Sequence, residues 1–417
     1  MTELLLARRG TKKEEVPTIP GTPWQGGFYA GLIRVGSDIY ALVVAPKSAE
    51  STLAWKTANT STPGATSLTD GRANTMAMVA AGVDLHPAAK HCVNYRGGGH
   101  DDWYLPSFRE LVVCYWNFKP NNTGNTTSVG SNPDSLPTTQ NYTAGSPSIS
   151  GAVDFQAGNP QAFNDAFGGA YWSSLAQTTA EAYVNHFNTG DAYEATKTSS
   201  LTVRPVRRVK IEIPDPPASI GEPYEGGFYA GRIWHPAGLS ALVVAPKALG
   251  GEAPRVWKTS DTTTVGTDSI SDGWANTQAM ATAGLANHPA AQFCRGLSIG
   301  GFNDWYLPSK DELEILYRNF KPTTTSNNTS FGANSNAVPP TGNYTSGNPS
   351  QTSTALFKQG AAEAFQASSY RSSTQYSPSH SWGQSFINGS QSGTTKTIAS
   401  YVRAVRRVPQ PIYVAKN

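Results

Sequence analysis

The sequence predicts an α+β protein built from two tandem modules. The first observation is a phrase that occurs twice, as DDWYLPSFREL from Asp101 and as NDWYLPSKDEL from Asn303. The second is the composition, because charged residues make up only 15% of the chain while Gly and Pro contribute 40 and 29 residues. Such a mixture is typical of short strands and many loops, not of long helices. The third is a small set of helix-start signals that both halves share.

The repeat extends over most of the 417 residues. The phrases GGFYAG, ALVVAPK, DG-x-ANT, HPAA, NFKP and VR-x-VRRV all recur at an offset of about 200 residues. Two copies of about 185 residues are domains of ordinary size, since a solenoid needs more and shorter units. We therefore predict an N-terminal docking segment (1–22), module 1 (23–209), a proline-rich linker (210–222), module 2 (223–408) and a C-terminal tail (409–417).

Each module is expected to begin with a β-hairpin and two short helices. In module 1, two apolar runs flank residues 36–38, Gly-Ser-Asp, which is typical of a hairpin turn. Asp70 is a suitable N-cap for a helix that Gly82 would end. Pro87 then starts a second helix at its first position, where the missing N–H costs little.

The repeated phrase predicts a third helix in each module. Ser107 with Glu110, and Ser309 with Glu312, form capping boxes before an apolar run. About fifty residues rich in Asn, Thr, Ser, Gly and Pro follow, which we expect to be long loops before the closing strands of a sheet. The spacing i, i+3, i+4, i+7 predicts a buried helix face in each module: Leu111, Cys114, Tyr115 and Phe118, and Leu313, Leu316, Tyr317 and Phe320.

The ordered motifs DG-x-ANT, HPAA…C, DWYLPS…EL, YWSS and VRPVR resemble the Lcl C-terminal domain family. That family, formerly a domain of unknown function, is frequent in phage and prophage proteins and in bacterial surface adhesins. The resemblance implies a C-type-lectin-like fold, with two or three helices beside a small, twisted, mostly antiparallel sheet and long loops. It also implies binding instead of catalysis. Arg371 departs from the pattern, because it replaces the Trp172 of YWSS and leaves the packing there open.

The charge, the apolar runs and the cysteine count argue against nucleic-acid binding, membrane insertion and a disulfide-based fold. The formal charge of +3 does not indicate nucleic-acid binding, and no apolar run of about 18 residues predicts membrane insertion. The opening residues MTELLLARRGTKKEE do not resemble a secretory signal. Cys92, Cys114 and Cys294 are too few for a disulfide scaffold, and we expect them to be buried thiols. These observations favour folding in a reducing cytoplasm.

No pattern predicts catalysis, a metal or a cofactor. No motif for a zinc protease, a phosphate-binding loop or a serine hydrolase occurs. His100, Asp101 and Asp102 correspond to Phe302-Asn303-Asp304, so only the last acid recurs. We expect this Asp to cap a turn or to pair with an arginine of the closing strand, such as Arg204 or Arg207.

A candidate ligand-binding surface comes from what differs between the copies. From Tyr171 and from Tyr370 the modules align without a gap, yet few residues are shared. A constant frame with variable aromatic and amide side chains fits a binding surface, although neutral drift of exposed residues remains the alternative. The candidates are Gln177, Tyr183, His186 and Tyr193 in module 1, and Arg371, Gln375, Tyr376, His380, Trp382, Gln384 and Gln391 in module 2.

A candidate protein interface comes from one face of the third helix. Phe108, Val112 and Trp116 are spaced four apart and would form an exposed apolar stripe unless a partner covers them. The corresponding residues of module 2, Lys310, Glu314 and Arg318, are expected to be a solvated stripe. We therefore predict that module 2, another subunit or another protein covers the helix of module 1.

The function expected from these features is a non-enzymatic phage virion protein of the tail tip or tail fibre. It would bind a host receptor, which could be a glycan, a pilus or an outer-membrane protein. The N-terminal segment and module 1 would contact other tail proteins, in a homo-oligomer such as a trimer. The alternatives are a virion decoration protein without receptor binding, a bacterial surface adhesin and, least favoured, an enzyme.

Overall fold

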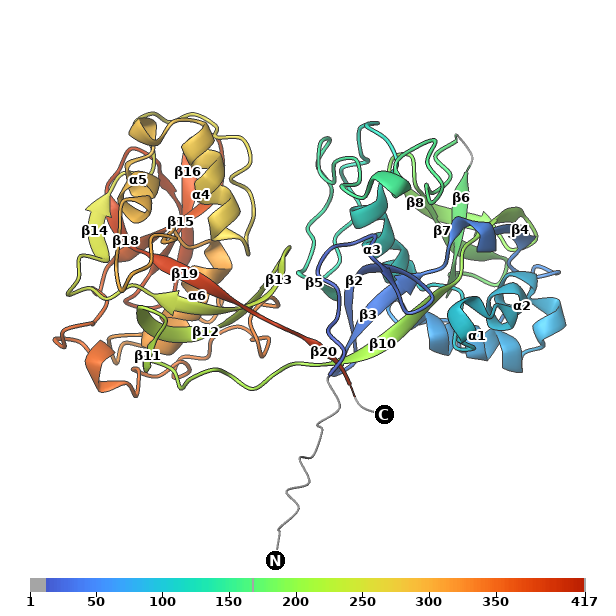
Figure 1. The fold of residues 1–417 in the computed structure, drawn as a ribbon, viewed down its shortest axis with the longest axis horizontal. Helices are drawn as coiled ribbons and strands as arrows, with labels where there is room; N and C mark the ends of the chain where they lie inside the picture. Colours follow the sequence, from blue (N-terminus) through green and yellow to red (C-terminus); the bar gives the residue numbers. More distant parts are fainter. Residues whose placement is uncertain (1–12, 167–168, 416–417) are drawn as a thin grey trace, which may run out of the picture. The chain divides into compact units, whose positions relative to one another are not determined.

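The computed structural model describes residues 13–166 and 169–415, so the first twelve residues of the predicted docking segment lie outside the described chain. The chain divides into two compact units. The first comprises the chain up to Pro214 together with the residues from Pro411 onwards, and the second runs from Asp215 to Gln410. Within the described residues, each unit contains three α-helices and two small sheets (Figure 1), which confirms the α+β class and the two tandem modules.

The first sheet of module 1 begins with the predicted hairpin. Val35 pairs with Asp38 across the turn, and a glycine bulge interrupts the register between Tyr29 and Gly31. All its pairings are antiparallel. In spatial order its strands are β1 (Pro23–Trp24), β2 (Gly27–Val35), β3 (Asp38–Val44), β10 (Val206–Glu212) and β20 (Tyr413–Val414), with β5 (Ser135–Leu136) paired to β2.

The second sheet of module 1 carries the segment that differs between the copies. A single parallel pairing joins β6 to β9, and the remaining pairings are antiparallel. Its outer strand β8 ends the sheet. The strands in spatial order are β4 (Ser51–Ala54), β9 (Ser200–Val203), β6 (Ala170–Ala176), β7 (Glu181–His186) and β8 (Ala192–Thr196).

The helices of module 1 begin where the sequence predicts. Asp70 accepts a hydrogen bond from the Ala73 N–H, and Pro87 opens the second helix. The Ser107–Glu110 capping box is complete. The helices are α1 (Gly71–Ala80), α2 (Pro87–Asn94) and α3 (Phe108–Phe118), with 3₁₀ turns η1 (Lys47–Ala49), η2 (Val83–Leu85), η3 (Gly97–Gly99) and η4 (Val153–Phe155).

Module 2 repeats this arrangement. Its first sheet has the order β11 (Pro223–Tyr224), β12 (Gly227–His235), β13 (Gly238–Val244) and β19 (Val405–Gln410). Its second has the order β14 (Glu252–Arg255), β18 (Ser400–Arg403), β15 (Ser369–Gln375), β16 (His380–Ser385) and β17 (Gln391–Thr395). Its helices are α4 (Gly273–Thr282), α5 (Pro289–Arg295) and α6 (Lys310–Phe320), with 3₁₀ turns η5 (Leu285–Asn287) and η6 (Ala355–Phe357).

The third helix of each module supplies the core between the two sheets. The predicted apolar positions of α3 and α6 are all buried. In module 1, the ring of Phe118 stacks on Phe155 with 3.8 Å between centroids, and Phe163 stacks on Phe187 at 3.9 Å. All three cysteines are buried free thiols, as predicted. This aromatic core joins the long loop to the sheet and fixes the frame on which the outer residues lie.

The end of the chain returns to module 1. Val414 pairs with Ile211 of β10, and the Val414 N–H donates to the Glu14 carbonyl over 2.9 Å. The Val16 N–H donates to the Ile412 carbonyl over 3.0 Å. Part of the N-terminal segment, part of the linker and part of the tail therefore form one short ladder at the edge of the module 1 sheet.

Candidate functional site

The recurring aspartate is a structural residue in both modules. Asp102 accepts two hydrogen bonds from Arg207, at 2.7 and 3.0 Å, and Asp304 accepts two from Arg406 at the same distances. This confirms the expected pairing with an arginine of the closing strand. The geometry is bidentate, so both oxygens of each carboxylate are engaged.

Arg371 lies in the interior of module 2, so it cannot belong to an exposed binding surface. Its side chain is 1% exposed and donates to Ser381 Oγ at 2.8 Å and to the backbone carbonyls of Thr394 and Ile398 at 2.7 and 2.6 Å. Burial lowers its pKa to about 10, and Asp261 opposes that shift. In module 1 the Trp172 indole fills this position and donates to the Leu53 carbonyl over 3.0 Å.

Three amide candidates are also largely internal. Gln384 is 2% exposed and donates to the Tyr344 hydroxyl over 2.8 Å, while Gln391 is 9% exposed and donates to Gln384. Gln375 is half-buried, and its Oε1 accepts from Lys396 Nζ at 2.6 Å. Sequence reasoning treated these residues as outer because strand alternation alone does not reveal which face another layer covers.

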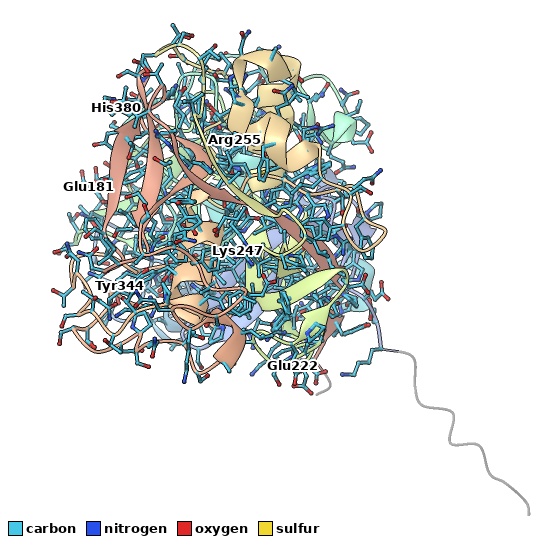
Figure 2. All side chains as sticks on the ribbon, turned by 90° about the vertical axis from the view of Figure 1, so that its left-hand side faces the viewer. Glu181, Glu222, Lys247, Arg255, Tyr344 and His380 are labelled. Atoms are coloured by element: carbon cyan, nitrogen blue, oxygen red, sulfur yellow. The ribbon has the colours of Figure 1, made fainter. Side chains whose placement is uncertain are left out.

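One exposed tyrosine of module 2 and two half-buried neighbours form an aromatic platform, which we define as Tyr376, Trp382 and Lys310. Tyr376 is 55% exposed, and its ring meets Trp382 edge-on with 4.6 Å between centroids. Lys310 Nζ lies 5.4 Å from the centre of the Trp382 ring. A side chain at Gly393 would begin 2.4 Å from the Tyr376 ring, so glycine there lets the ring lie against β17. His380, labelled in Figure 2, begins β16. Its ring centroid lies 6.5 Å from that of Tyr376.

Two further apolar residues are exposed on loops tied to this platform. Gln375 Oε1 accepts from the Thr264 N–H at 2.9 Å, which joins the loop of Val265 to the loop of Tyr376. Val265 is 86% exposed and Ile398 is 56% exposed. Module 1 has Pro63 and Ser199 at these two positions. The copy comparison could have found this difference, because both positions change from small or cyclic residues to large aliphatic ones.

The candidates of module 1 lie on the corresponding face. Gln177 is exposed where module 2 has Tyr376, and Tyr193 is 37% exposed. His186 is half-buried with its ring 5.9 Å from that of Tyr193. Tyr183 is half-buried against Phe108, with 5.3 Å between centroids. This surface is therefore smaller and more polar than the platform of module 2.

The predicted apolar stripe on α3 is not exposed, so that argument for an external partner is wrong. Val112 is 2% exposed, and Phe108 and Trp116 are half-buried. Tyr183 of β7 contacts Phe108, and Tyr142 of the long loop lies 5.8 Å from Trp116. The module covers the stripe with its own sheet and loop.

The matching stripe of module 2 is covered as well, so the expectation of a solvated face is also wrong. Glu314 is 1% exposed, and burial raises its pKa despite the opposing charge of Arg318. The predicted pair is present, with 2.8 Å between Arg318 Nε and Glu314 Oε1. Arg318 also lies 4.8 Å from the Tyr344 ring. Cation–π contacts in module 2 thus replace the aromatic pairs of module 1.

Caged lysines were missed by the sequence analysis. Lys119 Nζ donates to Asn125 Oδ1 at 2.7 Å and to the Thr123 carbonyl, and Lys321 contacts Asn327 and Thr325 in the same way. A lysine that follows the third helix in both copies was the available signal. These ammonium groups organise the long loops by collecting their carbonyl oxygens.

Each module also contains two further buried lysines whose ammonium groups are surrounded by loop carbonyl oxygens. In module 2, Lys258 and Lys396 share the Thr262 carbonyl, at 3.3 and 2.9 Å. Lys396 also lies 4.6 Å from the Trp257 ring. Burial, and secondarily the charge of Lys258, lowers the pKa of Lys396 to about 8. Lys56 and Lys197 occupy the same positions in module 1, and burial lowers both their pKa values.

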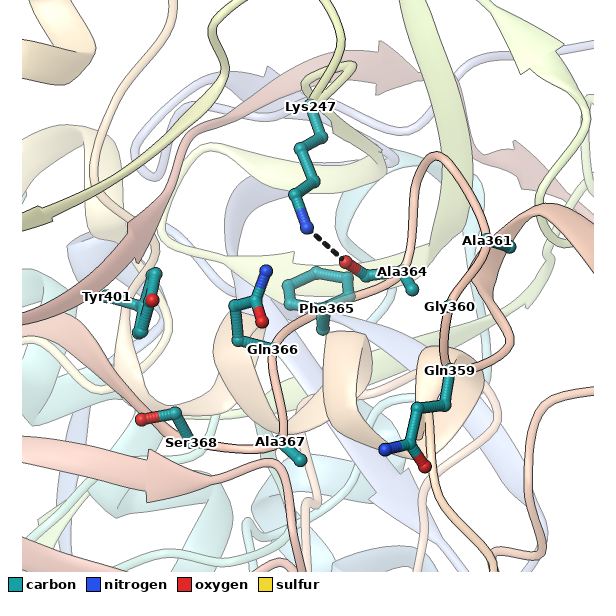
Figure 3. Close-up of a pocket in the computed structure, with 10 residues that line it drawn as sticks. All are labelled: Lys247, Gln359, Gly360, Ala361, Ala364, Phe365, Gln366, Ala367, Ser368 and Tyr401. Atoms are coloured by element: carbon teal, nitrogen blue, oxygen red, sulfur yellow. Dashed lines mark hydrogen bonds between the residues drawn. The ribbon is translucent and has the colours of Figure 1, made fainter.

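A cavity of about 520 Å³ opens beside β18 in module 2. Figure 3 shows the Lys247 ammonium directed at the Ala364 carbonyl, 2.9 Å away, above the Phe365 ring. Gln366 and Tyr401 lie on the same side of the cavity (Figure 3). Lys247 also lies 3.4 Å from Glu252, so its charge is balanced by a buried carboxylate. The cavity can therefore offer amide and hydroxyl groups beside an aromatic floor.

Within residues 13–166 and 169–415, no group of three or more His, Cys, Asp or Glu side chains is placed to hold a metal ion. No helix in the same described part is long and apolar enough to cross a membrane.

The fold and these surfaces define a tandem α+β protein whose two modules share one frame and differ in their outer residues. The family model of the Lcl C-terminal domain matches residues 47–207 and 256–406. The chain therefore belongs to the Lcl C-terminal domain family and carries two copies of that domain. Membership indicates a phage or surface-associated protein. No curated protein is similar enough to the chain to match it.

Proposed function

We propose that this protein is a non-enzymatic component of a phage tail tip or tail fibre and binds a receptor on the host cell. The observation that carries the proposal is the aromatic platform. Tyr376 is 55% exposed and lies on Trp382, whereas module 1 has Gln177 and Tyr183 at these positions of the same frame. Exposed aromatic side chains bury a large area on binding at a low entropic cost.

Module 2 is the better candidate for the receptor contact. Val265, Tyr376 and Ile398 are its exposed large apolar residues on loops that Gln375, Lys396 and Arg371 tie together. The cavity beside Tyr401 is lined by the loop that precedes β15 and is a separate candidate, with amide and hydroxyl groups in a charge-balanced setting. This chemistry favours a glycan among the receptor classes, since sugars combine hydroxyl groups with apolar ring faces. A pilus or an outer-membrane protein would instead use the apolar loop residues.

The remaining partners follow from the same proposal. Other tail proteins would hold the N-terminal segment, and the assembly would be a homo-oligomer such as a trimer. The protein would be located in the virion tail after assembly in the host cytoplasm. A decoration protein without receptor binding, and a bacterial surface adhesin, are the alternatives.

An adsorption competition tests the proposal. Purified full-length protein should bind host cells and reduce phage adsorption in proportion to its concentration. Tyr376→Ala should reduce cell binding at least tenfold, because the side chain is largely exposed and makes its ring contact within the platform. Gln177→Ala, at the matched position of module 1, is the control and should leave binding unchanged. Circular dichroism would verify that both variants remain folded.

The outcomes separate the alternatives. Protein that neither binds cells nor competes, yet associates with purified virions, would favour the decoration role. Binding that depends on Gln177 and not on Tyr376 would move the receptor contact to module 1. Detection of the protein on bacterial cells that carry no phage would favour the adhesin.

A further inference from the structure

Among the described residues of module 1, three buried polar atoms have neither a hydrogen-bond partner nor an ion-pair partner. They are the Tyr142 hydroxyl and both the Nδ2 and Oδ1 atoms of Asn185. Tyr142 is 2% exposed and Asn185 is 1% exposed. Buried polar atoms of native proteins are nearly always bonded to protein or to ordered water. We therefore expect these atoms to be hydrogen-bonded to a group outside the protein chain.

Module 2 provides the matched case. Tyr344 and Gln384 occupy the positions of Tyr142 and Asn185, and Gln384 Nε2 donates to the Tyr344 hydroxyl over 2.8 Å. Gln391 Nε2 in turn donates to Gln384 Oε1 over 3.3 Å, where module 1 has Ala192. The longer side chains of module 2 thus connect the long loop directly to the sheet.

The tyrosine is held in the same way in both modules. The Tyr142 ring lies 5.2 Å from Tyr115, and the Tyr344 ring lies 5.3 Å from Tyr317. The Tyr142 N–H donates to the Val129 carbonyl over 2.8 Å, and the Tyr344 N–H makes the equivalent bond over 2.7 Å. The two hydroxyl groups therefore occupy equivalent places in the two frames.

The amide is also held in the same register. Asn185 of β7 pairs with Tyr171 and Ala192, and Gln384 of β16 pairs with the equivalent Tyr370 and Gln391. Asparagine is one methylene shorter than glutamine, about 1.5 Å. In this register the Asn185 amide reaches less far from its strand than the Gln384 amide does, and neither the amide nor the Tyr142 hydroxyl has a direct hydrogen bond. Ala192 has only a methyl group where module 2 has the longer Gln391 side chain, which leaves additional space beside the Asn185 amide.

We propose that module 1 holds an internal water molecule bonded to the Tyr142 hydroxyl and to the Asn185 amide. A water needs two to four polar partners, and the Tyr142 hydroxyl with one atom of the Asn185 amide provides two. Two hydrogen bonds of about 2.8 Å through a water can span a gap that a single direct bond cannot. Val112 stands where module 2 has Glu314, so these atoms offer neutral dipoles without a carboxylate, which suits water better than a cation.

The consequence is a difference between the copies in how the long loop is fastened. In module 1 the loop that carries Tyr142 is joined to β7 through the water. In module 2 the corresponding loop is joined to β16 by direct side-chain bonds. The Asn185→Gln variant should displace the water and create the direct bond of module 2.

A crystal structure of the full chain at about 1.5 Å resolution tests the proposal. The expected map has a water peak within hydrogen-bonding distance of both Tyr142 Oη and the Asn185 amide. In crystals of the Asn185→Gln variant the peak should be gone and the new amide should contact Tyr142. The reciprocal double variant Gln384→Asn/Gln391→Ala should gain a water beside Tyr344.

Thermal unfolding provides a second measurement in solution. Asn185→Gln should raise the midpoint of the module 1 transition by roughly 2–4 °C, because a direct bond replaces an immobilised water. The module 2 transition should not move. A wild-type map without a peak at this position would overturn the proposal, as would a peak that persists unchanged in Asn185→Gln.

Discussion

Arg371 and Trp172 show how one buried position can be filled by opposite chemistries. Trp172 packs among apolar residues and satisfies its single donor on the Leu53 carbonyl. Arg371 is equally buried, but its guanidinium donates hydrogen bonds to Ser381 Oγ and to the backbone carbonyls of Thr394, Thr395 and Ile398. The guanidinium therefore serves as an internal fastener for the end of β17 and the loop after it.

The first prediction concerns this fastener. Arg371→Ala should lower the free energy of unfolding of module 2 by about 3 kcal/mol, because several buried acceptors lose their donor and a cavity forms. Urea unfolding of the full chain, followed by a probe for each module, measures the loss. Tyr376→Ala is the control and should change stability by less than about 0.5 kcal/mol. Equal stability of both variants would contradict the buried role of Arg371.

The second prediction concerns Lys396, whose pKa burial lowers to about 8. An unfolded lysine has a pKa of about 10.4. Between these values the unfolded chain binds more protons than the folded one, so stability should rise as the pH increases from 8 towards 10. Lys396→Met should reduce this rise, and the part that remains comes from Lys258 and Lys321, whose pKa values burial also lowers. The comparison is the urea midpoint of module 2 at pH 7.5 and 9.5, below the range where buried tyrosines begin to oppose folding.

A flat profile for the wild-type protein over that interval would contradict the shifted pKa of Lys396. Lys90→Met is a suitable control, because Lys90 lies on the surface and pairs with the exposed Asp84. That variant should retain the rise.

At the level of elements, the long loops are ordered by side chains instead of by regular backbone pairing. In module 1, residues 119–166 contain only β5, the 3₁₀ turn η4 and two isolated β-bridges as regular structure. Lys119 and Tyr115 both donate to Asn125 Oδ1, at 2.7 and 2.6 Å, and Asn125 Nδ2 donates to the carbonyls of the returning chain. The third helix thus fixes the loop through one lysine and one tyrosine.

The third prediction tests this arrangement in module 2. Lys321→Met should raise hydrogen exchange throughout residues 323–350, because Asn327 and the carbonyls of Thr325 and Pro349 lose their donor. The backbone amides of α6 should stay protected, since its buried face is unchanged. Exchange measured by mass spectrometry resolves the two segments. Equal protection of the loop in variant and wild type would refute the role of Lys321.

The same arrangement predicts the response to a chelator. Ammonium groups already occupy the carbonyl clusters that could otherwise attract a cation. Addition of EDTA should therefore leave the thermal midpoints of both modules unchanged within about 1 °C. A fall of several degrees that calcium restores would show that a metal also stabilises the loops.

At the level of the whole molecule, the chain passes between its two units twice, after Pro214 and before Pro411. The final residues contribute to module 1, where Ile412 is 4% exposed and Val16 is 5% exposed. Ile211 of β10 is 6% exposed in the same ladder. Strand β20 follows module 2 in the sequence but pairs with β10 of module 1.

The fourth prediction is that deletion of residues 411–417 destabilises module 1, although these residues follow module 2. Loss of the buried Ile412 side chain and its ladder bonds should lower the unfolding free energy of module 1 by about 2–3 kcal/mol. Module 2 should be unaffected, because β19 ends at Gln410. Denaturant unfolding with separate probes for the two modules distinguishes these outcomes. An effect confined to module 2 would contradict the ladder.

The sequence by itself determined the duplication, the class and the local signals. The capping boxes, the start of α2 at Pro87 and the hairpin turn depend on residues close together in the sequence, so they can be predicted without the fold. The family motifs DWYLPS and YWSS are also local, which is why the match to the Lcl C-terminal domain could be expected. The recurring acid predicted that Asp102 would cap a turn or pair with an arginine of the closing strand, and the structure shows that the partner is Arg207.

Only the tertiary structure decided which variable residues face solvent. Gln384 and Tyr376 both differ between the modules, yet the long loop covers the first and leaves the second 55% exposed. Val112 in module 1 and Glu314 in module 2 are each covered by other segments of their own module. An apolar stripe and a charged stripe are therefore buried to a similar extent. Periodicity identifies a face of a helix or strand, but burial depends on segments distant in sequence that fold over that face.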